Sequence, residues 1–158
     1  MELLWQELHS GLPDPRQLAV VVIRVIFATV LGAIIGLQRE KAGKAAGLRT
    51  HIIVSLGTTV VVLACAAVSM NLDGLSRVIQ GIVTGIGFVG AGSILKLNEQ
   101  REIKGLTTAA GLWLTAAIGI AVGLGVLGVA IIGTLLTVIV LSLVGVIESR
   151  QATSNKAA

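Results

Sequence analysis

Side chains that could do chemistry recur every four residues in one apolar segment. His51, Ser55 and Thr59 would share one face of a helix, because residues four apart are neighbours on a helix surface. A hydrolase built on His51 and Ser55 would also need an acidic residue to orient the histidine and donors for the oxyanion, and neither is identifiable. We therefore expect no enzymatic activity. The row is better explained as a hydrogen-bonding seam between helices.

A second polar row would share a face of another helix and form a similar seam: Arg77, Gln80 and Thr84.

Arg24 is the one clearly ionisable residue inside an apolar segment, which makes it a candidate functional residue. Its side chain would either extend to the lipid headgroups or pair with Asp73. No Asp or Glu lies inside an apolar segment, which argues against a carboxylate-driven cation pump but leaves a carbonyl-lined pore open. We expect no bound metal or cofactor.

Basic residues and threonines gather just before two apolar segments. Thr50 and either Thr107 or Thr108 are expected to cap helix N-termini, whose partial positive charge attracts anions. One interpretation is a site for acidic lipid headgroups, a phosphate-bearing ligand or an acidic protein; the other is that the charges serve only topology and solubility. The candidate ligand or partner site consists of Arg39, Glu40, Arg49, Thr50, His51, Thr107 and Thr108.

The composition excludes an ordinary soluble domain. Of the 158 residues, 54% are apolar and only 13% charged, and the mean hydropathy is +0.95. A soluble domain carries about 25% charged and about 45–50% apolar residues. The length allows one domain, embedded in a membrane. The net charge of +4 is then a topology signal, and we expect no nucleic-acid partner. The single cysteine, Cys65, cannot form an internal disulfide.

Apolar runs predict an all-α membrane protein with five transmembrane helices, at about residues 17–38, 51–71, 78–95, 106–122 and 126–147. Residues 105–147 carry no charge, so the division of the last two helices rests on Gly123-Leu124-Gly125. We expect an external tail over 1–16, the transmembrane domain over 17–148 and a cytoplasmic tail over 149–158. No basic segment precedes the first apolar run, so no cleaved signal peptide is expected.

Charged loops predict the orientation. The loops after the first and third predicted helices carry seven Lys or Arg residues, whereas the other connections carry few charges. The positive-inside rule therefore places both basic loops in the cytoplasm, with the N-terminus outside and the C-terminus inside.

Glycine stripes predict close helix packing, because small residues let helix backbones approach each other in lipid. They also suggest a homodimer. A shift of 58 residues aligns Gly32-Ala33 with Gly90-Ala91 and Gly47-Leu48 with Gly105-Leu106. This echo suggests an internal two-fold repeat of helix pairs 1–2 and 3–4, running in the same direction. The glycines expected at packing contacts are Gly32, Gly36, Gly81, Gly85, Gly87, Gly90, Gly92, Gly111 and Gly119.

Three ordered stretches resemble the MgtC/SapB family: GLQREKAGKAAGLRTHIIVSLGTT (36–59), RVIQGIVTGIGFVGAGSIL (77–95) and GLTTAAGLWLTAAIGIAVGLG (105–125). The resemblance implies a bacterial inner-membrane protein linked to growth in low magnesium, acid stress and virulence. It also implies a regulator that acts on a membrane partner such as the rotary ATP synthase. The chain departs from many members, which have Asp-Pro-x-Arg before the third helix, and it stops before the soluble C-terminal domain that some carry.

The leading interpretation is therefore a stress-related membrane regulator that binds lipid or protein partners. A small homo-oligomeric transporter or channel for Mg²⁺ or another ion is the alternative, and a structural subunit of a larger complex is a third.

Overall fold

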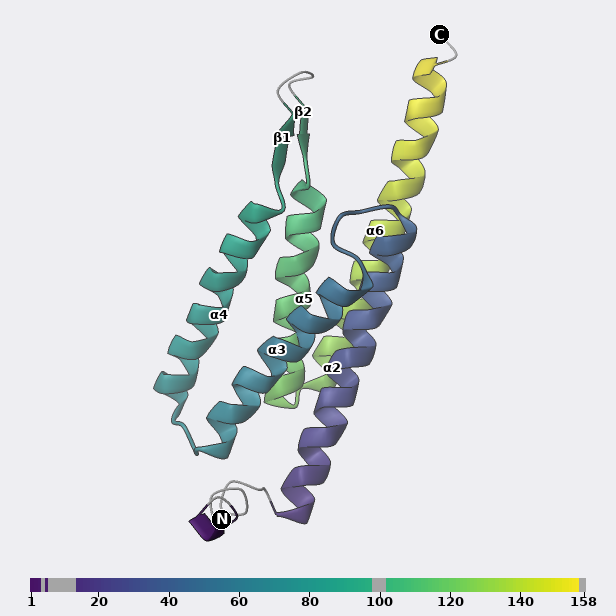
Figure 1. The fold of residues 1–158 in the computed structure, drawn as a ribbon. Coiled ribbons are helices and arrows are strands. Elements are labelled where there is room, and N and C mark those ends of the chain that lie inside the picture. Colours follow the sequence, from purple (N-terminus) through teal and green to yellow (C-terminus); the bar gives the residue numbers. More distant parts are fainter. Residues whose placement is uncertain (4, 6–13, 98–101, 157–158) are drawn as a thin grey trace.

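The computed structural model describes residues 1–3, 5, 14–97 and 102–156 (Figure 1). Five long helices dominate this part of the chain: α2 (Pro15–Lys41), α3 (Leu48–Ala67), α4 (Leu72–Gly92), α5 (Leu106–Leu124) and α6 (Leu127–Lys156). Two three-residue strands, β1 (Leu95–Leu97) and β2 (Glu102–Lys104), pair antiparallel between α4 and α5. The prediction of an all-α membrane bundle is confirmed, with this small hairpin as an addition.

Local capping explains where several helices begin. Asp14 Oδ1 accepts hydrogen bonds from the backbone N–H groups of Arg16 and Gln17 at the start of α2, where Pro15 is the first helical residue. Asn71 Oδ1 accepts from Gly74 N–H, so α4 begins at Leu72 rather than near residue 78. α6 continues to Lys156 through the segment expected to be a tail.

Four helices, α2 to α5, are long and apolar enough to cross a membrane. The fifth contributes a shorter apolar stretch, Leu127–Leu143. A hydrocarbon core of about 30 Å is matched by about 20 helical residues. The chain is therefore a membrane protein. The internal repeat of helix pairs stays a prediction.

The two ends of the bundle differ in character (Figure 1). At the hairpin end lie the β1–β2 hairpin, the connection 42–47 and the end of α2. At the turn end lie the start of α2 and the tight connections from α3 to α4 and from α5 to α6. Gly125, which ends α5, has a φ angle of +83°, and residues other than glycine rarely adopt that backbone conformation.

Helix α5 forms the centre of the bundle. It packs against α2, α3, α4 and α6, whereas α4 packs mainly on α5 and stands at one side (Figure 1). The most buried residues accordingly lie on α5 and on the facing sides of α2 and α3. Ala28 and Ile35 of α2 and Val122 of α5 are fully buried in the larger apolar cluster.

Glycines of α2 and α5 allow the closest approaches to α3. A Cβ on Gly36 would lie 2.7 Å from Leu48 Cα, and one on Gly32 would lie 2.8 Å from the His51 carbonyl oxygen. A Cβ on Gly119 would overlap Thr58 Oγ1 and the Ser55 carbonyl oxygen. The backbones of α2 and α5 therefore lie in direct contact with α3, as small residues permit in membrane bundles.

Candidate functional site

A row of buried polar side chains crosses the interface of α2, α3 and α5, and we call it the polar seam. Each of its members is at most 3% exposed. The α3 members stand four residues apart, which places them on the helix face that meets α5. The seam consists of Arg39 from α2, His51, Ser55 and Thr59 from α3, and Thr108 and Thr115 from α5.

Arg39 forms the hairpin end of the seam. Its Nη2 group donates to Thr107 Oγ1 at 3.3 Å and to Thr108 Oγ1 at 3.4 Å. Arg39 is 2% exposed, so its charge is held inside the bundle and not presented to solvent as the anion-site interpretation requires. The two threonines face the guanidinium, and the residue that caps α5 is Gly105 and not Thr107 or Thr108.

His51 links α3 to α5 in the middle of the seam. Its Nδ1 lies 2.7 Å from Thr115 Oγ1, and the Thr115 hydroxyl donates to the Gly111 carbonyl at 2.8 Å. The donor in the contact between His51 and Thr115 is set by the tautomer of the imidazole ring. Nε2 has no hydrogen-bond partner in the described part of the chain.

Ser55 and Thr59 continue the seam toward the turn end. Thr59 Oγ1 donates to the Gly119 carbonyl at 2.8 Å, whereas Ser55 Oγ has no partner among the described residues. The seam can hold three helices in register through hydrogen bonds. It brings together Arg39, His51 and Thr108 of the predicted ligand site, with Thr107 at its edge, but not Glu40, Arg49 or Thr50.

Those remaining residues lie at the surface of the hairpin end. Glu40 Oε2 accepts from the Leu48 backbone N–H at 2.9 Å and so satisfies one of the N–H groups in the first turn of α3. The helix begins after Gly47, so the expected capping role of Thr50 is wrong. Glu40, Lys44, Arg49 and Thr50 line a hollow of about 270 Å³. A carboxylate of the chain thus accepts from one N–H group at the helix terminus where we predicted an anion site, and that site stays a prediction.

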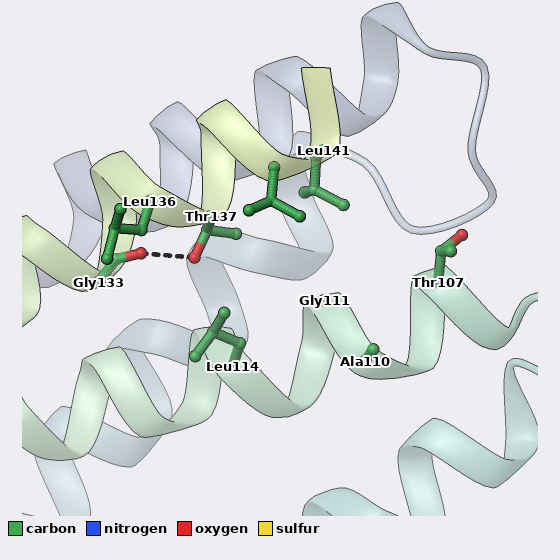
Figure 2. Close-up of a pocket in the computed structure, with 9 residues that line it drawn as sticks. Thr107, Ala110, Gly111, Leu114, Gly133, Leu136, Thr137 and Leu141 are labelled. Carbon is green, nitrogen blue, oxygen red and sulfur yellow. Dashed lines mark hydrogen bonds between the residues drawn. The ribbon is translucent and has the colours of Figure 1, made fainter. Parts of the chain in front are cut away.

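An apolar groove of about 440 Å³ lies between α5 and α6 along part of their length (Figure 2). Thr107 lies at one end of the groove, and the Thr137 hydroxyl donates to the Gly133 carbonyl at 2.6 Å. Gly111 forms part of the wall, and a Cβ on it would lie 3.6 Å from His51 Cε1. Only the backbone of α5 therefore divides the groove from the polar seam.

Arg24 lies at the turn end and is half-buried there. Its Nη1 group donates to the carbonyl oxygen of Gly123 at 2.7 Å. This carbonyl belongs to the last turn of α5, where a cation is favoured by the helix dipole. The hydrogen bond therefore links α2 to the α5–α6 turn, which is a contact that neither expected role included.

Helix α4 turns a row of polar and small residues away from the rest of the bundle. Arg77, Gln80 and Thr84 are all exposed, and Phe88 is 85% exposed. A Cβ on Gly81, Gly85, Gly87 or Gly92 would meet nothing within 4 Å, whereas Gly90 faces Ala109 of α5. Asp73 is exposed near the start of the helix. We call Arg77, Gln80, Gly81, Thr84, Gly85 and Phe88 the α4 face.

Acidic, histidine and cysteine side chains do not gather into a metal-binding cluster of three or more in the described ranges. Thr115 and the Gly123 carbonyl were not predicted as partners of His51 and Arg24. The four-residue repeat of Gly111, Thr115 and Gly119 predicts that this face of α5 is packed. It carries no information on which α3 residue lies opposite.

Comparison with known proteins gives a consistent result. The MgtC family model matches residues 25–150. The Escherichia coli K12 protein named "Putative magnesium transporter YhiD" is 38% identical over 141 residues, covering 85% of this chain and 65% of that protein. Protein SrpB of Synechococcus elongatus is 38% identical over 130 residues, covering 75% of this chain and 71% of SrpB.

Protein MgtC of Salmonella typhimurium is 41% identical over 104 residues, covering 66% of this chain but only 43% of MgtC. The chain thus spans just under two thirds of YhiD and less than half of MgtC. No solved structure matches it significantly.

Proposed function

Because the chain belongs to the MgtC family, we propose that it is a membrane regulator that binds a partner within the bilayer through the α4 face. The observation that carries this proposal is the outward orientation of Arg77, Gln80 and Thr84 on a helix apolar enough to span a membrane. Polar side chains that face lipid are costly, and in membrane bundles they are normally covered by another helix.

The outward faces of the other helices differ from the α4 face. On α2, for example, Ile26, Val30 and Ile34 are exposed and are all suited to lipid. The glycines of the α4 face add a second feature, because they leave room for a partner backbone to approach closely. Hydrogen-bonding side chains beside open glycines fit another transmembrane helix better than they fit lipid chains.

Two kinds of protein partner are compatible with this face. A second copy of the chain would give a homodimer. A different membrane protein, such as the rotary ATP synthase implied by the family resemblance, would give a regulatory complex.

We further propose a bacterial inner-membrane location with the hairpin end in the cytoplasm, because Lys41, Lys44, Arg49 and Lys104 lie at that end. A role in magnesium limitation, acid stress or virulence is part of the same proposal.

Photo-crosslinking in native membranes tests the use of the α4 face. A photoreactive amino acid at Thr84 is expected to give a discrete protein adduct, because a partner helix covers that position. The matched control is the same amino acid at Val30, which is 48% exposed on α2 and is expected to react with lipid only.

The mass of the Thr84 adduct distinguishes the partners. An adduct of twice the chain mass supports the homodimer, and a different discrete mass supports a regulatory complex. Lipid adducts alone at both positions would overturn the proposal.

Transport of Mg²⁺ or another ion is a second candidate function. It is favoured by the printed name of YhiD and by the polar seam, whose members recur along α3 from His51 to Thr59. Ion flux into proteoliposomes separates the two proposals. Ion flux that is faster than in empty liposomes and falls in a Ser55→Ala variant would favour transport over regulation, because Ser55 Oγ has no hydrogen-bond partner among the described residues and its removal breaks no hydrogen bond there.

A further inference from the structure

A second pocket, of about 370 Å³, lies at the turn end between the start of α2 and the end of α3. Two arginines of α2, Arg16 and Arg24, line it together with Gln17, and Ser69 closes the side next to the α3–α4 connection. The remaining wall is apolar and consists of Val20, Val21, Leu63, Ala66 and Ala67. We call this the Arg16–Arg24 pocket. It is separate from the polar seam and from the α4 face.

The charge in the pocket is positive. No acidic side chain lines it within the described residues. The carboxylate nearest in sequence, Asp14, uses its Oδ1 atom to accept from the backbone N–H groups of Arg16 and Gln17 at 2.9 and 2.8 Å. Arg24 uses Nη1 for the Gly123 carbonyl, and a guanidinium carries five N–H donors. Donors therefore remain for an anion in the pocket.

Arg16 and Arg24 both line the pocket, and eight residues of helix separate their backbones by about 12 Å. Long side chains on a helix lean toward its N-terminus, which directs Arg24 along α2 toward the level of Arg16. Planar guanidinium groups suit phosphate oxygens, to which they donate charge-assisted hydrogen bonds. Two arginines on one cavity therefore favour a phosphate group as the ligand.

The apolar wall of the pocket and its position in the bundle indicate which class of phosphate-bearing molecule would bind. α3 ends at Ala67 and α5 ends at Leu124, so the pocket lies where the helices leave the hydrocarbon layer. An anion at this level, beside an apolar wall that continues along α2 and α3, belongs to a molecule with a charged head and an apolar tail. We propose that the Arg16–Arg24 pocket binds an anionic phospholipid, with its phosphate between the arginines and an acyl chain along Val20 and Leu63.

Binding can be measured on the full chain purified in a neutral detergent. Phosphatidylglycerol is titrated against phosphatidylcholine with the same acyl chains, and bound lipid is counted by native mass spectrometry. The wild-type chain is expected to bind phosphatidylglycerol at least ten-fold more tightly than phosphatidylcholine. Arg16→Gln is expected to weaken phosphatidylglycerol binding about ten-fold, because it removes a charge-assisted contact. Inorganic phosphate is tested in parallel.

Two further variants separate the pocket from general effects. Arg49→Gln removes the same charge from an exposed residue outside the pocket and outside the α4 face, and it is expected to leave binding unchanged. Ala67→Leu keeps every charge but fills the apolar wall, and it is expected to weaken binding several-fold. Equal losses in Arg16→Gln and Arg49→Gln, equal binding of the two lipids, or inorganic phosphate that competes as well as the lipid would each overturn the proposal.

Discussion

Replacing Gly119 by alanine is expected to unfold the bundle at a much lower temperature. The added Cβ would overlap the Ser55 carbonyl oxygen and Thr58 Oγ1, so α3 and α5 would have to separate. Overpacking of this kind costs about 1–3 kcal/mol, and we expect the upper part of that range because a backbone atom is in the way. Separation would also lengthen the hydrogen bond from Thr59 to the Gly119 carbonyl.

Gly57→Ala is the matched control for this experiment. Gly57 lies on α3, and a Cβ there would meet nothing within 4 Å. Alanine favours a helix over glycine by about 1 kcal/mol, so this variant should be as stable as the parent or slightly more stable. Cys65 is buried and unpaired, so its reaction with a thiol-specific fluorophore on heating reports unfolding. Equal unfolding temperatures for the two variants would contradict the close contact of α3 and α5.

Replacing Arg39 by lysine is expected to destabilise the chain by about 2 kcal/mol although the charge is kept. Nη2 of the guanidinium donates to both Thr107 and Thr108, whereas a lysine ammonium stands on a shorter side chain and is more strongly hydrated, so it is costlier to hold in this buried site. The loss should be largest at the hairpin end, where Arg39 joins α2 to α5.

Arg49→Lys provides the control, because Arg49 is an exposed arginine near the start of α3. The same thiol assay should show no change in the unfolding temperature for this variant. If Arg39→Lys and Arg49→Lys unfold at the same temperature as the parent, the buried position of Arg39 and its role in the polar seam are wrong.

The bundle and the buried row on α3 could be predicted because they follow from local patterns. Long apolar runs require helices in lipid, and the four-residue spacing of His51, Ser55 and Thr59 puts them on one face of a helix wherever that helix packs. The structure places all three at 0% exposure. The spacing of Arg77, Gln80 and Thr84 likewise predicted that they share one face of a helix. It could not predict whether that face meets the other helices or points away from them, because that depends on how α4 packs.

The contacts between residues on different helices could not be predicted, because a single sequence carries no information on helix register. Arg24 reaches a carbonyl 99 residues away, where the end of α5 leaves an acceptor unused within its own helix. Glu40 likewise accepts a hydrogen bond from Leu48 N–H at the start of α3, a contact between two elements that the spacing of residues does not reveal. The Arg16–Arg24 pocket was missed because its two walls come from separate helices.

Cysteine accessibility tests the membrane account most directly. In a chain whose Cys65 is replaced by alanine, Lys44→Cys marks the hairpin end and Asp73→Cys marks the turn end. With a membrane-impermeant thiol reagent on spheroplasts, we expect labelling of Asp73→Cys at once and of Lys44→Cys only after permeabilisation. Labelling of both positions from the same side would contradict a bundle that spans the bilayer with its basic end in the cytoplasm.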